Sequence, residues 1–190
     1  DLVRSRGLGD VYKEGLVLDS NILVKLVTNE PYSKQARTTI TALLKKDYSF
    51  HTVDVALAES LNAIWKHTNI HKDLKPEEAN LTIQDLTKIY DKLNILTTRE
   101  LTQESADIAL TKNITIYDAL YVAATQKLNA TLYTADQKLY NIANKITSSK
   151  LLKAKNLEPS IVLLIFAPKN YRVYPILVVW EAYICIFCFM

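Results

Sequence analysis

Four acidic residues lie in segments whose other residues are mainly apolar. Asp19 ends the apolar run that begins at Gly15, and Glu59 lies within an apolar helical segment. Asp118 precedes a long apolar stretch, and Asp136 follows a short one. A carboxylate in such a setting is destabilising unless hydrogen bonds, a proton or a cation compensates its charge. The pattern therefore indicates a site built from carboxylates, and a metal site is the first interpretation.

The types of ligand favour a hard divalent cation. If three of the acids follow strands of one parallel sheet, they lie at the same edge, where open α/β sheets bind ligands. Carboxylates at such short range repel one another, and one takes up a proton unless a cation is present. Oxygen ligands without histidine or thiolate favour Mg²⁺ or Mn²⁺ over zinc. Because such an ion activates water and neutralises phosphate charge, the arrangement predicts metal-dependent cleavage of a phosphoester.

Structural roles compete with this interpretation. Asp19, Asp118 and Asp136 each precede a predicted helix and could cap it, with Thr115 completing a capping box before Asp118. Glu59 could instead lie on the exposed face of its helix. Taken singly, each acid is explained by these roles, but their recurrence at the ends of predicted strands favours a common site.

Either Asp54 or Glu59 could be the acid that this segment contributes to the site. Residues five positions apart on a helix point in different directions, so only one of the two should face the other acids. The sequence around Glu59, with Asn62 one turn later, favours Glu59. Tyr117 and Tyr121 flank Asp118, and the sequence assigns them neither to the core nor to the site.

Hydrophobic periodicity predicts strands that alternate with helices, which is typical of an α/β domain with a parallel sheet flanked by helices. Thr52 or Asp54 is expected to cap a helix whose buried side includes Trp65, and a polar linker is expected from His67 to Asp73. Strands are predicted at 16–19, 48–52, 94–98, 130–134 and 148–152. Helices are predicted after Asp19, at 33–46, after Asp54, from Pro76 to Leu93, and at 101–112, 117–128 and 137–146.

Composition excludes several classes of protein. The 190 residues are 49% hydrophobic and 23% charged with a net charge of +3, so one globular domain fits and no strongly basic surface is expected. Neither G-x-x-x-x-G-K-[ST] nor G-x-G-x-x-G occurs, and we expect no nucleotide cofactor. No cysteine precedes Cys185, as is common in a reducing compartment, and a cytoplasmic location is expected.

The chain divides by composition into three parts. An N-terminal extension of residues 1–14 is charged and unlike a secretory signal, and residues 15–152 form the predicted domain. Residues 153–190 form an apolar tail whose two runs are too short to span a membrane. The tail could be an added strand pair or partner contact, a membrane-surface segment, or an artefact of translation. Cys185 and Cys188 form C-x-x-C there without further ligands, which we attribute to chance.

Four motifs of this sequence resemble those of PIN-domain nucleases, and their order and intervals are similar to those of the VapC toxins of prokaryotic toxin–antitoxin pairs. The resemblance extends from about Gly15 to Leu152. The motifs are Leu18-Asp19-Ser20-Asn21, Ala58-Glu59-Ser60-Leu61-Asn62, Tyr117-Asp118-Ala119-Leu120-Tyr121 and Tyr133-Thr134-Ala135-Asp136.

The resemblance implies a Rossmann-like, single-domain endoribonuclease that cuts RNA with Mg²⁺ or Mn²⁺ and leaves 5′-phosphate and 3′-hydroxyl ends. It implies a homodimer that is silenced by a cognate antitoxin protein. By position, the metal-binding and catalytic acids would be Asp19, Glu59, Asp118 and Asp136. Ser20, Asn21 and Thr134 would support them.

Two other functions remain open on the sequence. A PIN-like domain could bind RNA or protein without cutting. An aspartate-based phosphatase or phosphoacceptor domain could use Asp19 as nucleophile, although phosphatases of that kind carry a second aspartate two positions later, where this chain has Asn21.

Overall fold

The structure is a computed structural model that describes residues 14–153. The tail of residues 153–190, with Cys185 and Cys188, and the N-terminal extension lie outside the described residues except for Glu14 and Lys153. No helix among the described residues is both long and apolar enough to cross a membrane.

Five parallel strands form a single sheet in the described part of the chain. Their order is β3-β2-β1-β4-β5, which places the first strand of the sequence in the centre. Leu16, Val17 and Leu18 on this central strand are all almost fully buried, as expected where helices cover both faces of a sheet. The strands are β1 (Gly15–Leu18), β2 (Ser49–Val53), β3 (Asn94–Leu96), β4 (Thr131–Thr134) and β5 (Ser149–Leu151).

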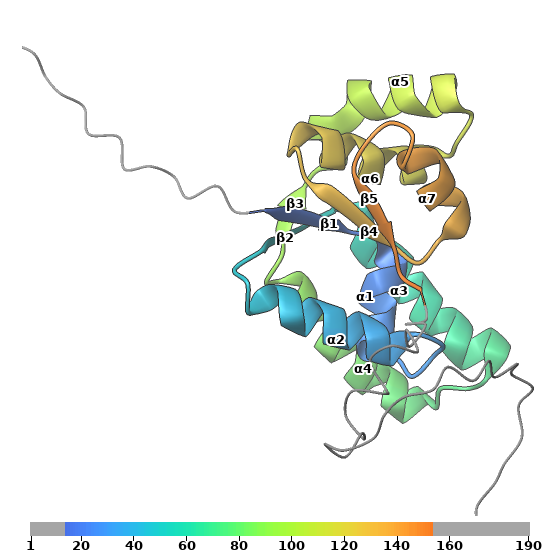
Figure 1. Ribbon diagram of the computed structural model, residues 1–190. Coiled ribbons are helices and arrows are strands. Elements are labelled where there is room, and N and C mark those ends of the chain that lie inside the picture. The colour runs from blue at the N-terminus through green and yellow to red at the C-terminus, as the bar shows by residue number, and fades with distance from the viewer. Residues whose placement is uncertain (1–13, 154–190) are drawn as a thin grey trace, which may run out of the picture. The chain divides into compact units, whose positions relative to one another are not determined.

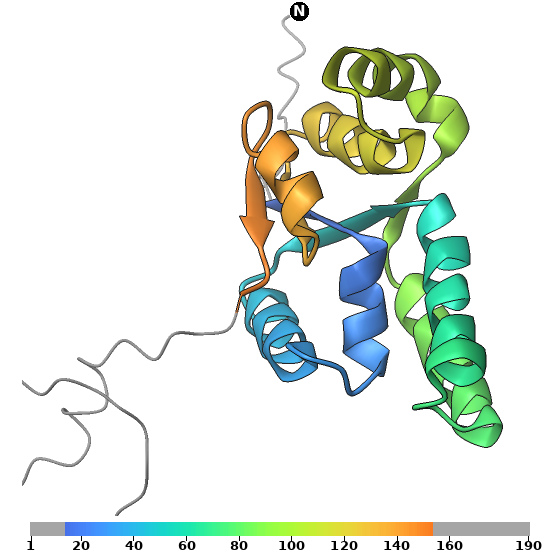
Figure 2. The same cartoon turned by 90° about the vertical axis from the view of Figure 1, so that its right-hand side faces the viewer.

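Helices cover the two faces of the sheet in two separate groups (Figures 1 and 2). One group is α1 (Ser20–Val27), α2 (Ser33–Leu44), α3 (Val55–Lys66) and α4 (Pro76–Tyr90). The other is α5 (Thr102–Lys112), α6 (Ile116–Lys127) and α7 (Gln137–Ala143). Two short helices, η1 (His67–His71, a π-helix) and η2 (Thr98–Leu101, a 3₁₀-helix), complete the described chain.

The direction of the chain across the sheet reverses between β1 and β4. From β1 the chain moves outward through β2 to β3, then returns through α5 and α6 to β4 on the other side of β1. In open α/β sheets, such a reversal leaves a crevice at the carboxyl ends of the two diverging strands. Asp19 follows β1 directly, and Asp136 follows β4, so both lie at this crevice.

The predicted fold class is confirmed, because the sheet is parallel and flanked by helices. The prediction that 117–128 is a helix enclosed in the core is also confirmed. Residues 119–125 of α6 are all buried, and Figures 1 and 2 both show α6 between the sheet and α5. A helix covered on both sides has no polar face, which explains its continuous apolar sequence.

The buried side of α3 differs from the predicted one. Trp65 is 52% exposed, and the buried residues are Ala56, Ser60 and Ile64. The small side chain of Ser60 lets α3 approach α1 closely enough for its hydroxyl to donate a hydrogen bond to the Ser20 carbonyl at 3.3 Å. This close contact turns the helix so that Trp65 faces outward.

The predicted linker from His67 to Asp73 is wrong, because the chain continues from α3 into η1. Side chains in this turn bond back to the helix. Thr68 donates to the Ile64 carbonyl, Asn69 donates to the Trp65 carbonyl, and His67 Nδ1 bonds to the Asp73 carboxylate at 3.0 Å. These bonds stabilise an extra helical turn in a polar segment that has no apolar periodicity.

Candidate acidic site

Each of the four acids is held near the crevice by a different element. Asp19 is the N-cap of α1, and Asp136 is the N-cap of α7. Asp118 lies in the first turn of α6, and Glu59 lies within α3. The site is therefore assembled from segments that are far apart in the sequence.

The Asp19 carboxylate is buried, with only 4% of the residue exposed, and it accepts hydrogen bonds from three side chains. Thr134 Oγ1 and Asn21 Nδ2 both donate to Oδ2 at 2.5 Å, and Ser20 Oγ donates to Oδ1 at 3.3 Å. These bonds orient the carboxylate. The expectation that Asp19 caps α1 through its side chain is wrong, because the side chain makes no such bond.

Thr134 and Asn21 also join the two sides of the crevice. The Thr134 hydroxyl accepts from the backbone N–H of Asp136 at 2.9 Å, and the Asn21 Oδ1 accepts from the backbone N–H of Ala135 at 2.8 Å. The Asp19 N–H donates to the carbonyl of Tyr133 at 3.1 Å. The three expected supporting residues, Ser20, Asn21 and Thr134, thus all contact Asp19, and two of them fix β4 against the start of α1.

Asp118 and Asp136 have the structural roles that the alternative interpretation assigns to them. Thr115 Oγ1 accepts from the Asp118 N–H and donates to Oδ2 of the same residue at 2.9 Å. Asp136 Oδ1 accepts from the N–H groups of Lys138 and Leu139. In each carboxylate, however, the second oxygen has no hydrogen bond from the described residues. Capping therefore leaves one oxygen of each acid available for a ligand.

Glu59, not Asp54, faces the other acids. Its Oε2 accepts a hydrogen bond from the buried Tyr121 hydroxyl at 2.6 Å. Asp54 faces elsewhere, because its carboxylate accepts from the N–H and the hydroxyl of Thr98 at 2.8 and 2.6 Å. Asp54 is the N-cap residue of α3, one of the two expected alternatives, but its side chain makes no capping bond. Thr52 does not cap the helix, because its hydroxyl donates to the carbonyl of Leu18.

Tyr121 is the site neighbour that the sequence left unassigned. Besides its bond to Glu59, its hydroxyl accepts from the backbone N–H of Ser20 at 3.3 Å. The sequence contains only a weak indication of this role. Tyr121 lies about one helical turn after Asp118, and its hydroxyl stands among small and aliphatic residues. Burial raises the pKa of this phenol far above its usual value, and the charges of Asp19 and Glu59 add to the effect. The hydroxyl therefore stays protonated and is available as a donor.

The acids influence one another electrostatically in pairs. Burial raises the pKa of Asp19 to about 6; the bonds from Thr134 and Asn21 oppose this rise, and the negative charges of Glu59 and Asp118 add to it. Burial also raises the pKa of Asp118, with a further contribution from Asp136. Within residues 14–153, no recorded ion pair involves any of the four acids. No cationic side chain of the described residues therefore pairs with these acids.

The acids do not form a compact ligand set as they stand. Among the described residues, no three carboxylate, imidazole or thiol groups lie together closely enough to hold a metal ion. Hydrogen bonds hold Asp118 to Thr115 and Asp136 to the start of α7. The chemistry of the donors, which are all oxygen atoms, still suits a hard divalent cation.

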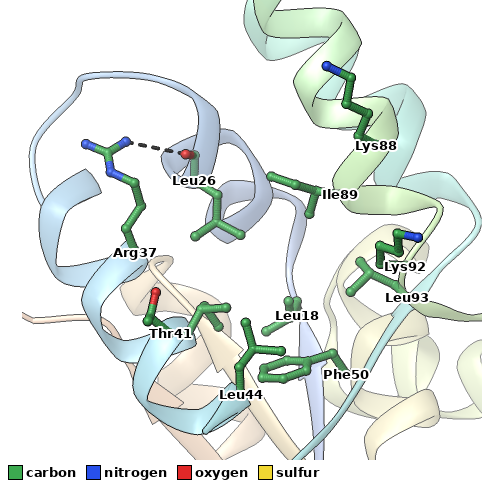
Figure 3. A pocket seen from close by; sticks show the side chains of 11 residues that line it. Leu18, Leu26, Arg37, Thr41, Leu44, Phe50, Lys88, Ile89, Lys92 and Leu93 are labelled. Carbon is green, nitrogen blue, oxygen red and sulfur yellow. Dashed lines mark hydrogen bonds between the residues drawn. The ribbon is translucent and has the colours of Figure 1, made fainter.

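The surface has a small cleft beside the acids and a larger apolar groove away from them. A small cleft of about 200 Å³ is lined by Ser20, Asn21 and Glu59 and continues along α1 and α3 to Lys25 and His67. A larger apolar groove of about 500 Å³ contains none of the acids (Figure 3). Leu44 of α2 lines this groove and is 60% exposed.

Metal-free protein should lose stability as the pH rises from about 4 to 7. The pKa of Asp19 is about 6 in the fold against 3.8 as its ordinary value, so the native state binds more protons between these values and unfolding becomes easier with rising pH. A difference of about two pKa units corresponds to about 3 kcal/mol. Urea denaturation at pH 4 and pH 7.5 in a chelator should show this loss in the wild type relative to Asp19→Asn. Equal pH dependence in the two proteins would contradict the assignment.

Comparison with known proteins gives a consistent result. The family model of the PIN domain matches residues 16–145. Ribonuclease VapC3 of Pyrobaculum aerophilum is 30% identical over 124 residues, which are 65% of this chain and 91% of that protein.

Solved structures share the fold. A Pyrobaculum aerophilum protein superposes with a TM-score of 0.54 at 20% identity, over 72% of this chain and 89% of its own. A toxin–antitoxin complex from Klebsiella pneumoniae gives a TM-score of 0.52 at 16% identity, over 73% of this chain and 98% of the matched one. At these identities the structures are informative about the fold alone.

Proposed function

The chain belongs to the PIN domain family, and we propose that it is an Mg²⁺- or Mn²⁺-dependent endoribonuclease of the VapC type, the toxin of a toxin–antitoxin pair. The observation that carries the proposal is the Asp19 carboxylate. It is buried at the crevice between β1 and β4, with the charges of Glu59 and Asp118 nearby and no cationic partner among the described residues. The similarity to Ribonuclease VapC3 supports RNA as the substrate class.

The proposed metal ion would be held by Asp19, Glu59, Asp118 and Asp136. Because hard oxygen donors select Mg²⁺ and Mn²⁺, and a cation would relieve their mutual repulsion, these acids suit such an ion better than zinc. When bound, the ion supplies activation of water and neutralisation of negative charge on the phosphate. Asp118 and Asp136 each keep one oxygen without a hydrogen bond from the described residues, and this oxygen would be available to the ion.

The protein's own residues would then position the reaction. Ser20, Asn21 and Thr134 hold the Asp19 carboxylate in one orientation, so little reorganisation is needed when the phosphodiester binds. Attack by water in line with the leaving oxygen would produce 5′-phosphate and 3′-hydroxyl ends. Sequencing or labelling of the RNA ends checks this product assignment.

The proposed partners are a cognate antitoxin and a second copy of the chain. For the antitoxin we favour the apolar groove between α2 and α4, where Leu26, Leu44, Phe50 and Ile89 offer apolar surface (Figure 3). Lys88 of α4 and Lys92, two residues after the end of α4, lie beside the groove. An amphipathic segment with acidic residues would therefore match both the apolar surface and the positive charge. Exposed Trp65 offers apolar surface for contact with another chain.

A matched pair of substitutions tests the proposed nuclease. Glu59→Gln removes a charge that faces Asp19, and we expect RNA cleavage to fall by about 10²-fold, equivalent to ~3 kcal/mol of barrier. Asp54 is the N-cap residue of the helix that carries Glu59, but its carboxylate faces Thr98. Asp54→Asn should keep the wild-type rate and lose about 1 kcal/mol of stability. Initial rates on labelled single-stranded RNA with Mn²⁺ measure both effects.

The same assay decides between the proposal and the non-catalytic alternative. A wild-type protein that binds RNA but does not cleave it with either metal would show that the domain only binds. Equal loss of activity in both variants would contradict the assignment of Glu59 to the site.

A further inference from the structure

The Tyr121 hydroxyl lies where three helices meet beside the acids. Tyr121 is 1% exposed, and its hydroxyl donates to Glu59 Oε2 of α3 at 2.6 Å and accepts from the Ser20 N–H of α1 at 3.3 Å. One side chain of α6 thus contacts the helix that carries Glu59 and the first residue after Asp19.

Glu59 depends on this contact far more than Asp19 depends on any one of its own. The Asp19 carboxylate accepts from three side chains. Among the described residues, by contrast, the bond from Tyr121 is the one hydrogen bond recorded for the Glu59 carboxylate. A glutamate has three side-chain torsions, and a partly exposed one loses considerable rotamer freedom when it is fixed. The buried phenol therefore decides where this carboxylate points.

We propose that Tyr121 is a positioning residue, whose hydroxyl fixes the Glu59 carboxylate beside Asp19 and thereby sets the affinity of the site for a divalent cation. The inference rests on the proposed function, because it assumes that Glu59 is a metal ligand. Residues that hydrogen-bond to a metal ligand and orient it typically contribute about 10- to 100-fold to metal affinity, which is lost when they are replaced.

Packing alone is not sufficient to explain a tyrosine at this position. Residues 119–125 form a continuous buried run, and phenylalanine would fill the same volume without a buried polar group. A buried phenol is accommodated only if its hydroxyl is paired, and both partners here belong to the site. Tyr121→Phe therefore separates the two roles, since it keeps the ring and removes the hydroxyl.

Isothermal calorimetry of Mn²⁺ binding to the full chain tests the proposal without relying on catalysis. We expect Tyr121→Phe to bind Mn²⁺ about 10-fold or more weakly than the wild type. Tyr90→Phe is the matched control, because its hydroxyl donates to the Asp54 carbonyl at 3.4 Å, away from the acids, and its Mn²⁺ affinity should be unchanged. Raising the Mn²⁺ concentration should restore RNA cleavage by Tyr121→Phe.

A double-mutant cycle shows whether Tyr121 acts through Glu59. In the Glu59→Ala background, Tyr121→Phe should cause no further loss of Mn²⁺ affinity, because the carboxylate that it positions is gone. Additive losses would overturn the proposal, as would a wild-type affinity in Tyr121→Phe. If circular dichroism shows that Tyr121→Phe does not fold, Glu59→Asp replaces it; this variant keeps the charge but withdraws the carboxylate from the hydroxyl, and it should bind Mn²⁺ as weakly.

Failure of the inference and failure of the proposed function give different results. A wild-type chain that binds Mn²⁺ and cuts RNA, with Tyr121→Phe equal to it in affinity, overturns the positioning role alone. A wild-type chain that neither binds Mn²⁺ nor cuts RNA overturns both.

Discussion

Replacing Asp19 by asparagine should abolish RNA cleavage and at the same time stabilise the metal-free protein. The buried carboxylate is the proposed central ligand, and its loss should reduce the rate by about 10³-fold or more, equivalent to at least ~4 kcal/mol of barrier. Asparagine keeps an oxygen that can accept from Thr134 and Asn21 but carries no charge to bury. The same substitution thus removes the function and a source of instability.

Rates on labelled RNA and urea denaturation at pH 7.5 in a chelator measure the two effects on the same preparations. Asp85→Asn is a suitable control, because Asp85 is an exposed residue of α4 that pairs with Lys88 at 2.9 Å. It should change neither quantity appreciably. Cleavage by Asp19→Asn at the wild-type rate would contradict the assignment of Asp19 as the central metal ligand.

Removing divalent metal should abolish cleavage completely, and adding Mn²⁺ should restore it and raise the melting temperature. The ion binds the folded site and not the unfolded chain, so a concentration of 100 times the dissociation constant stabilises by about 2.7 kcal/mol. It also offsets the repulsion that Asp19 experiences from Glu59 and Asp118. Dialysis against a chelator, followed by thermal unfolding with and without Mn²⁺, measures the effect.

Asp19→Asn provides the internal control for this experiment, since it lacks the central ligand and should gain little stability from Mn²⁺. Full activity after exhaustive chelation would contradict metal dependence. Equal stabilisation of wild type and Asp19→Asn by Mn²⁺ would show that the ion binds elsewhere.

The fold was largely predictable because local sequence patterns and burial agree. The short run Leu16-Val17-Leu18 can be buried on both faces only in the middle of a covered sheet, and the structure places β1 there. The same logic applies to α6, whose apolar residues face the sheet on one side and α5 on the other. The outward turn of Trp65 was not predictable, since it depends on the close approach of Ser60 to Ser20.

The candidate site was predictable in part. Short motifs indicate which acids follow strands or precede helices, and the structure brings Asp19, its three supporting residues and Glu59 into contact or electrostatic range. The roles of Asp19, Glu59, Asp118 and Asp136 as metal ligands stay predictions. The bond of Tyr121 to Glu59 joins positions 62 apart, and that of Thr98 to Asp54 joins positions 44 apart. No local pattern encodes such pairings, which arise only when helices from different parts of the chain pack together.

The wide separation of the hydrogen-bonded residues has a consequence for synthesis of the chain. Thr134 and Asp19 are 115 positions apart, and the bond between Ala135 and Asn21 joins positions 114 apart. A nascent polypeptide that has left the ribosome only as far as α6 lacks β4, and its Asp19 has neither the Thr134 donor nor the strand beside β1. Contacts between residues so far apart in sequence are slow to form, because loop-closure entropy opposes them. Translation products that stop before β4 therefore carry no assembled site, and the proposed cleavage of RNA begins only with chains that extend beyond β4.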